Sequence, residues 1–220
     1  MTNAYDISHF FAGLMLVVSF TLIYQDRVLA VLKTFAVQAI ILSLAVAWEA
    51  WVQVRPHLFI TAALAFGLKG VIIPWALHQM IFKLGIHRDI EQVVGMGLTL
   101  LLGLGLTALS LMLVLKATGG APSLAREGLA IALAIVLLGM LMMITRRNAV
   151  TQIIGFMSIE NGLILGATGA RGMPLVVEIS VAFSVLIALF VFAVFVFRIR
   201  ERFDTVDVVA LESVRGDANE

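Results

Sequence analysis

The sequence predicts an all-α, polytopic integral membrane protein with about seven transmembrane helices. Of its 220 residues, 61% are hydrophobic and only 13% are charged, which leaves too little polar material to cover a soluble domain. The apolar residues also come in blocks of roughly 20, the length that a helix needs to cross a hydrocarbon layer. A transmembrane β-barrel would instead require alternating segments of about ten residues, and the sequence shows none.

The apolar blocks follow one another along the chain, and polar or helix-breaking residues separate them. Gln25-Asp26-Arg27 lies between the first two blocks, Arg55-Pro56 precedes the third, and Arg146-Arg147-Asn148 lies between the fifth and the sixth. Most connections are short, so we expect neighbouring helices to run antiparallel. The expected helices cover residues 7–24, 29–53, 57–82, 92–115, 125–145, 148–170 and 175–197.

Basic residues at the block ends predict the orientation, because cytoplasmic loops are rich in Lys and Arg. If the C-terminus lies in the cytoplasm, most of the 15 Lys and Arg residues lie at cytoplasmic ends. An odd number of spans then leaves the N-terminus outside. Residues 203–220 alternate acidic and apolar positions and are expected to form a cytoplasmic tail.

The composition excludes several classes of function. The sequence contains no cysteine, which excludes thiolate-held iron–sulfur clusters and cysteine zinc sites. The four histidines have no metal-ligand spacing, and no phosphate-binding loop or nucleophile elbow is present. The net charge of +1 gives no basic field for nucleic acid. We therefore expect no cofactor, no metal and no catalytic centre in this chain, which is surrounded by the lipid bilayer.

Charged residues inside the expected helices are the main candidates for function. An ionised side chain near the bilayer centre costs about 2.5–3.5 kcal/mol on insertion scales, so such residues are rare without a role. Glu160 lies near the middle of the sixth helix, Lys69 is central in the third, and Glu178 lies near the outer end of the seventh. These three are predicted to handle protons. Glu49, His78 and Asn161 are possible secondary residues.

Two interpretations of Lys69 stay open at this stage. Pro74 cannot donate a hydrogen bond to the carbonyl of Gly70, so we expect an irregular helix beside Lys69, of the kind that lines hydrated cavities. In one interpretation Lys69 and a carboxylate load and unload protons, and in the other they form a static interhelical pair. Glu178 and Glu49 are shallow enough to be solvated at the membrane interface, and His78 fits an interface histidine as well as proton uptake.

Glycines recur in the sixth block, where Gly162 and Gly166 form a GxxxG pair. Small residues at this spacing let two helices approach closely. We favour packing within this chain over a face for another subunit.

Residues 145–155, with the sequence TRRNAVTQIIG, resemble the start of the second helix in the small K-type subunit of respiratory complex I. That subunit is related to the C subunit of Mrp-type antiporters, and the similarity extends over residues 125–216. The whole chain resembles the hydrogenase-4 component E family of formate-hydrogenlyase-type complexes. The matching motifs are LKGVIIP at 68–74, QIIG at 152–155, ENG at 160–162, VEI at 177–179 and TVD at 205–207.

The carboxylates depart from the K-type pattern. The first glutamate of that subunit falls on Met157, and Glu160 lies three residues later, about one helical turn. The second falls on Val185, and Glu178 lies seven residues earlier. Some component E relatives also carry an acidic residue where this chain has Ser184.

The resemblance implies three parts: a four-helix membrane extension at 1–120, a K-like three-helix unit at 121–202 and the tail at 203–220. It implies a non-redox membrane subunit of a group 4 [NiFe]-hydrogenase or similar complex, in a bacterial or archaeal cytoplasmic membrane. The expected partners are antiporter-like and quinone- or hydrogenase-foot membrane subunits, with [NiFe] and iron–sulfur subunits contacted indirectly. Electron transfer in the partners would drive protons, or Na⁺, through Glu160, Glu178 and Lys69. A purely structural spacer and a stand-alone secondary transporter remain alternatives.

Overall fold

The computed structural model describes residues 2–84, 94–118, 123–169 and 186–187. Within these ranges the elements are all helical, and no β-strand occurs. They are α1 (Thr2–Tyr24), α2 (Val28–Val52), α3 (Pro56–Leu64), the π-helical segment η1 (Ala65–Ile72), α4 (Ile73–Leu84), α5 (Met96–Ala117), α6 (Ser123–Thr145) and α7 (Ala149–Gly169).

Six helical stretches in the described ranges are long and apolar enough to cross a membrane. They are Asp6–Tyr24, Val28–Val52, Pro56–Gln79, Met96–Ala117, Arg126–Thr145 and Val150–Gly169. These bounds lie within a few residues of the first six expected helices, which confirms the all-α membrane class. The seventh expected helix (175–197) lies outside the described residues except for Leu186 and Ile187, and the tail at 203–220 lies outside them entirely. Ile187 packs against the buried apolar core.

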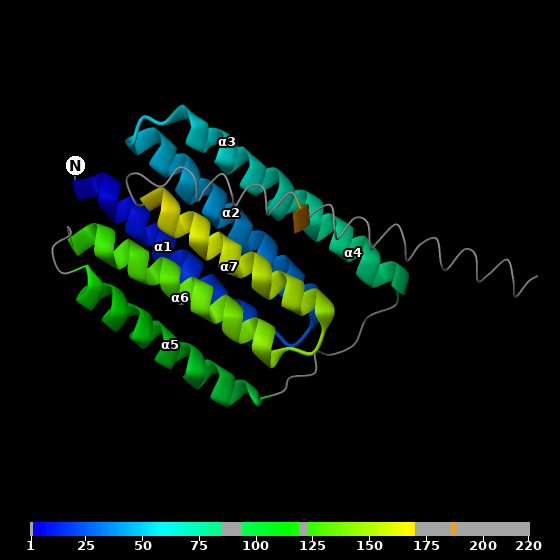
Figure 1. Cartoon of the computed structure of the whole chain (residues 1–220). Helices are drawn as coiled ribbons and strands as arrows, with labels where there is room; N and C mark the ends of the chain where they lie inside the picture. The colour runs from blue at the N-terminus through cyan, green and yellow to red at the C-terminus, as the bar shows by residue number, and fades with distance from the viewer. Residues whose placement is uncertain (1, 85–93, 119–122, 170–185, 188–220) are drawn as a thin grey trace, which may run out of the picture.

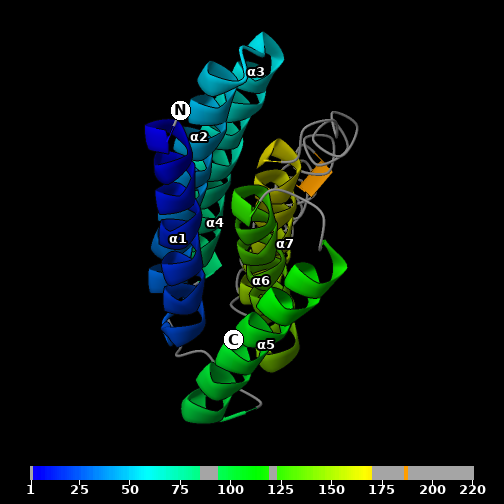
Figure 2. The ribbon, with the colours of Figure 1, turned by 90° about the vertical axis from the view of Figure 1, so that its left-hand side faces the viewer.

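The helices lie side by side, and successive helices run in opposite directions (Figure 1). α3, η1 and α4 follow one another along one line and together make the third span. α6 packs against α7, α5 and α1, while α2 packs against α1, α7 and the third span. Figure 2 shows α1, α2 and α4 on one side of the α6–α7 pair, and α5 crosses obliquely in front of that pair. The expected 1–120 and 121–202 units therefore share contacts, and the division into units remains a prediction.

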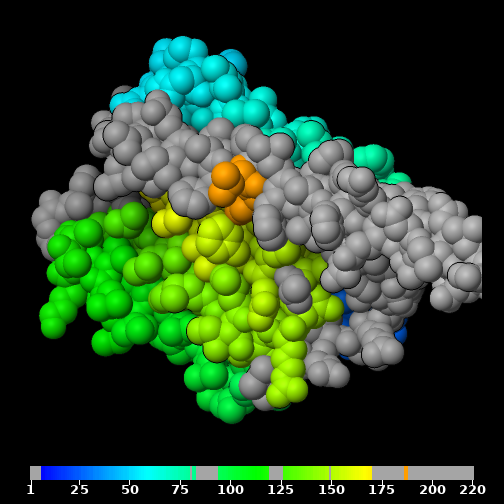
Figure 3. All heavy atoms as spheres, turned by 45° about the vertical axis from the view of Figure 1, so that its right-hand side comes forward, coloured from blue at the N-terminus to red at the C-terminus, as the bar shows by residue number. Residues whose placement is uncertain are grey.

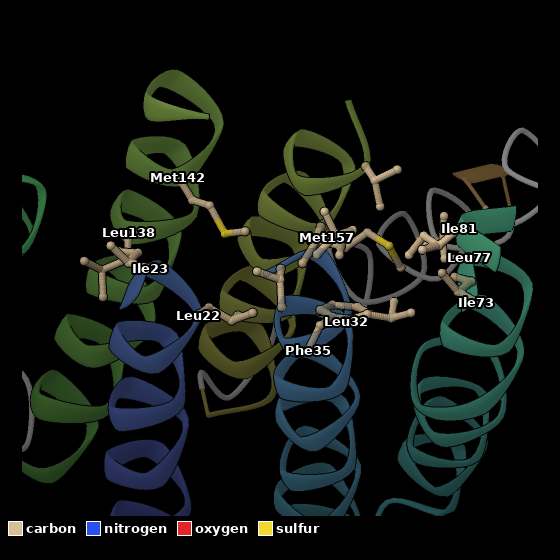
Figure 4. Packing of buried hydrophobic residues seen from close by; sticks show 14 of the residues in the cluster. Leu22, Ile23, Leu32, Phe35, Ile73, Leu77, Ile81, Leu138, Met142 and Met157 are labelled. Atoms are coloured by element: carbon tan, nitrogen blue, oxygen red, sulfur yellow. The ribbon is translucent and has the colours of Figure 1, made fainter. Parts of the chain in front are cut away.

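The buried core draws side chains from α1, α2, α4, α6 and α7. One apolar cluster includes Leu22, Phe35, Leu77, Leu138 and Met157. Figure 4 shows the α2 and α7 members of this cluster between those of α6 and those of α4. A second cluster, which includes Met15, Val46 and Ile164, lies along the other half of α1, α2, α6 and α7 and takes its third-span residues from α3 and η1.

α5 is the least buried of the six spans. Only 22% of its most apolar window is buried, against 50% for α6 and 61% for α7. It lies at the edge of the molecule beside α6 (Figures 1 and 3). Ser110 nevertheless ties it to α6, because its Oγ donates a 2.5 Å hydrogen bond to the carbonyl of Ala130.

The α6–α7 contact depends on glycines that face each other. A Cβ built on Gly139 would lie 2.7 Å from Cγ1 of Ile159, and one built on Gly162 would lie 2.9 Å from the carbonyl oxygen of Ala132. Gly166 also faces Ala132. The GxxxG pair therefore packs against a helix of the same chain, and the intramolecular interpretation is confirmed.

The α6–α7 turn is anchored to the end of α1. Arg146 is only 2% exposed, and its guanidinium donates to the carbonyl oxygens of Ile23 and Gln25, the latter at 2.8 Å. These carbonyls belong to the last turn of α1 and to the residue that follows it, where helical partners are lacking and a cation is favoured. Burial lowers the pKa of Arg146, and the carboxylate of Asp26 acts in the opposite direction. Arg146 thus joins two turns at the same end of the molecule.

Candidate functional site

Lys69 is buried in the third span and forms an ion pair with Glu160 of α7. Lys69 is 1% exposed and Glu160 is 4% exposed. The Nζ of Lys69 lies 3.2 Å from Oε2 of Glu160 and donates a 2.9 Å hydrogen bond to Oδ1 of Asn161. Two of the three main predicted residues and one secondary residue therefore meet in one place.

The helix around Lys69 is irregular, as Pro74 predicted. The irregularity takes the form of the π-helical segment η1, which ends at Ile72. At its end the N–H of Ile73 donates to the carbonyl oxygen of Leu68, five residues earlier, as a π-helix requires. Pro74 then begins the next turn without an N–H to donate. The third span stays continuous, and its wider turns carry the lysine. π-Helical turns inside α-helices are frequent at functional sites.

Asn161 links the ion pair to α2. Its Nδ2 donates a 3.2 Å hydrogen bond to Oε1 of Gln38, and Gln38 and Asn161 are both 0% exposed. The Nε2 of Gln38 donates in turn to Oγ of Ser19, at 2.8 Å, and to Oγ of Ser158, at 3.0 Å. A buried polar network therefore runs from the third span through α7 and α2 to α1.

Gln38, Ser19 and Ser158 were missed as site residues from the sequence. Gln38 offered a signal, since it is a polar residue in the middle of α2. The serines offered none, because a serine in a membrane helix commonly bonds the carbonyl four residues earlier. Ser19 does so, donating 2.8 Å to the carbonyl oxygen of Met15, and accepts from Gln38 as well.

The burial of this network determines the free energy needed to keep its two charges. A charge buried in an apolar medium is expensive unless a partner and hydrogen bonds compensate it. Here the ammonium of Lys69 has the carboxylate of Glu160 and the amide oxygen of Asn161. The pair has no net charge, and each of its two residues can bind or release a proton beside the other.

Met157, on which the K-type resemblance would place a glutamate, lies one turn before Glu160 on α7. It is 0% exposed and belongs to an apolar cluster. Both residues therefore face the interior, as the spacing predicted. The carboxylate of this chain lies one turn further on, at the level of Lys69.

Glu49 lies in a different cluster near the end of α2. Its Oε1 accepts a 2.6 Å hydrogen bond from Oγ of Ser8, and its Oε2 accepts a 2.8 Å hydrogen bond from Nε2 of Gln53. Gln53 also donates to the carbonyl oxygen of Thr168 at the end of α7. Glu49 is eleven residues from Gln38, about 16 Å along the helix. It therefore joins the ends of α1, α2 and α7 rather than the Lys69 network.

The remaining predicted residues do not join the pair. His78 is exposed on α4, and its ring lies 4.6 Å from that of Phe82. Glu178, Val185 and Ser184 lie outside the described residues. Within the described ranges, no three His, Asp or Glu residues come together as a metal site.

Known proteins with similar sequences include hydrogenase-4 component E. The chain is 26% identical to that protein from Escherichia coli K12 over 207 residues, which cover 93% of this chain and 95% of the relative. The corresponding protein of Shigella flexneri matches equally well. An uncharacterized protein of Mycobacterium tuberculosis is 26% identical over 211 residues, covering 94% of each chain. No family model and no solved structure matches. The similarity is distant and extends over nearly the whole chain.

Proposed function

We propose that the chain is a non-redox membrane subunit of an energy-converting, hydrogenase-type complex, in which the Lys69–Glu160 pair helps to move protons, or Na⁺. The observation that carries the proposal is a fully buried lysine, on a π-helical turn, 3.2 Å from a buried carboxylate. Both residues lie in helices of membrane-spanning length. The similarity to hydrogenase-4 component E supports the type of complex.

The pair has the geometry for one proton step within the chain. Transfer of a proton from Nζ of Lys69 to Oε2 of Glu160 breaks an N–H bond, forms an O–H bond and leaves both groups neutral. The two atoms lie 3.2 Å apart as an ion pair, and the step requires the ammonium to turn one N–H toward Oε2. Each neutral group can then exchange a proton with the next carrier, and Glu178 is the proposed carrier from the seventh span.

The partners follow from the same proposal. The electron carriers belong to [NiFe]-hydrogenase and iron–sulfur subunits, because this chain has no cysteine to hold them. Antiporter-like and quinone- or hydrogenase-foot membrane subunits would continue the ion path on either side. Within this chain we assign residues 1–120 to an extension and residues 121–202 to a unit like the complex I K-type subunit. The complex would lie in a bacterial or archaeal cytoplasmic membrane, with the C-terminus of this chain in the cytoplasm.

Glu160→Gln tests the ion-moving role. The variant keeps the side-chain volume and removes the carboxylate. In membrane vesicles that hold the whole complex, we expect electron transfer to continue while ion uptake per electron falls to a small fraction of the wild-type value. Glu49→Gln is the matched control and should leave uptake near the wild-type level, because Glu49 belongs to another cluster. Normal uptake with Glu160→Gln would end the proposal.

A structural spacer is the second candidate, and it is favoured by the two buried partners that hold Lys69 between the third span and α7. In that case Glu160→Ala should reduce the amount of assembled complex on a native gel, while the assembled fraction moves ions normally. Purification of the tagged chain from its own membranes tests both candidates against a stand-alone transporter. We expect hydrogenase or quinone-oxidoreductase subunits to purify with it, whereas a transporter would be isolated without them.

A further inference from the structure

Gln38 is a buried amide that hydrogen-bonds Asn161, which is itself a partner of Lys69. It lies in α2, is 0% exposed, and holds Asn161 on one side and two hydroxyl groups on the other. Its three hydrogen-bonding partners come from α1 and α7. A buried side chain with all of its polar atoms engaged in this way controls the orientation of its neighbours.

The direction of each hydrogen bond in this network follows from the lysine. A lysine ammonium has three donors and no acceptor, so Asn161 must turn its Oδ1 toward Lys69. The Nδ2 of Asn161 then faces Gln38, which must present Oε1 to it. This leaves Nε2 of Gln38 for the two serine hydroxyls, which accept.

The hydroxyls complete the arrangement. Ser19 accepts a hydrogen bond from Gln38 and donates one to the carbonyl oxygen of Met15. Ser158 accepts the second N–H of the Gln38 amide. Both amides therefore have their oxygen atoms directed toward Lys69. If Gln38 turned over, its Nε2 would meet the Nδ2 of Asn161, and two donors would face each other.

From these contacts we infer that Gln38 is a positioning residue that, held by Ser19 and Ser158, keeps the oxygen of Asn161 directed at Lys69. The inference rests on the proposed function, because Lys69 is the group whose proton is moved. The two sides of the Lys69 ammonium then have different roles. Amides do not relay protons as carboxylates do, so the Gln38 side orients Lys69 and the Glu160 side exchanges the proton.

Two substitutions at Gln38 distinguish positioning from packing. Gln38→Met keeps the length and the approximate volume of the side chain but removes every hydrogen bond. Gln38→Glu, neutral in this buried place, keeps an oxygen acceptor for Nδ2 of Asn161 and one O–H donor for Ser19 or Ser158. If Gln38 positions Asn161, ion uptake should fall several-fold with Gln38→Met and be largely retained with Gln38→Glu. If Gln38 only fills space, ion uptake should be higher with Gln38→Met than with Gln38→Glu, because methionine suits an apolar core and a carboxyl group does not.

The serines provide an independent check. Ser19→Ala and Ser158→Ala each remove one acceptor from Nε2 of Gln38, and the other acceptor remains. We expect each single variant to retain most ion uptake and the double variant to lose as much as Gln38→Met. Equal and additive losses from the two single variants would contradict the inference.

Solid-state NMR of the full-length chain in lipid bilayers tests the positioning without any ion movement. With ¹⁵N-lysine and ¹³C-asparagine labels, the wild type should show transfer between Nζ of Lys69 and Cγ of Asn161, and Lys69→Met assigns the signal. Gln38→Met should weaken this transfer several-fold, and Gln38→Glu should preserve it. An unchanged transfer in Gln38→Met overturns the inference. Normal ion uptake in Glu160→Gln, with the NMR result as expected, would instead remove the proposed function and leave the positioning intact.

Discussion

Lys69 and Asn161 are joined by a 2.9 Å hydrogen bond, and Glu160, the preceding residue of α7, holds the same ammonium at 3.2 Å. Successive residues of an α-helix point roughly 100° apart. The ammonium must therefore lie between the side chains of these two consecutive residues of α7. This contact fixes the rotation of α7 relative to the third span, and it places the carboxylate beside the π-helical turns of η1.

Replacing one member of the Lys69–Glu160 pair should destabilise the fold more than replacing both members. Lys69→Met leaves the carboxylate of Glu160 buried without its counter-ion, which typically costs about 3–5 kcal/mol. The double variant Lys69→Met/Glu160→Gln removes both charges and should recover much of that loss. Thermal unfolding of the detergent-solubilised chain provides the measurement. If the double variant is less stable than either single variant, the ion pair is not what stabilises this contact.

Close packing of α6 on α7 gives a second prediction. Gly139→Ala brings a Cβ within 2.7–2.9 Å of Ile159 and of the carbonyl oxygen of Gly155, and overpacking of this kind costs about 1–3 kcal/mol. Gly105→Ala is the matched control, since no atom lies within 4 Å of its built Cβ. Alanine there should be neutral or stabilising by up to about 1 kcal/mol, because it has the higher helix propensity. Equal stability of the two variants would show that α6 and α7 can separate freely.

The sequence predicted the six described spans and the residues of the ion pair for simple reasons. The length of an apolar block sets where a helix can span, and a charge in such a block stands out. The pairing of Lys69 with Glu160 could not be predicted, because it depends on which helices are neighbours. The role of Gln38 could not be predicted for the same reason, because its hydrogen-bonding partners come from α1 and α7.

Arg146 illustrates a second limit of the sequence. Its position between two apolar blocks predicted a basic residue at the cytoplasmic end of a helix, where arginines are commonly solvated. In the structure it is 2% exposed and bonds the carbonyl groups of Ile23 and Gln25. Its burial against the end of α1 distinguishes it from Arg147, which is exposed.

Arg146→Ala should therefore destabilise the chain much more than Arg147→Ala. The first variant removes the hydrogen bonds from a cation to the end of α1, and a hydrogen bond to a charged group contributes about 1.5–3 kcal/mol. The second should cost less, because the side chain of Arg147 is exposed and interactions of exposed charges contribute at most about 1 kcal/mol. Limited proteolysis at the α1–α2 turn and thermal unfolding should both rank the two variants in this order. The reverse ranking would contradict the assigned anchoring role.

The orientation of the chain can be tested with cysteine labelling, because the natural sequence contains no cysteine. Gly95, before α5, and Gly169, at the end of α7, are exposed and lie at opposite ends of the molecule. Neither has an atom within 4 Å of a built Cβ, so cysteine fits at both. The positive-inside rule predicts Gly169 outside and Gly95 in the cytoplasm.

A membrane-impermeant maleimide added to intact cells should accordingly label Gly169→Cys and not Gly95→Cys. After permeabilisation both variants should react to a similar extent, which controls for differences in reactivity. Labelling of Gly95→Cys alone in intact cells would reverse the orientation and move the N-terminus into the cytoplasm. Labelling of both variants in intact cells would contradict the antiparallel arrangement itself, because α5 ends where α6 begins and α7 returns to that same end.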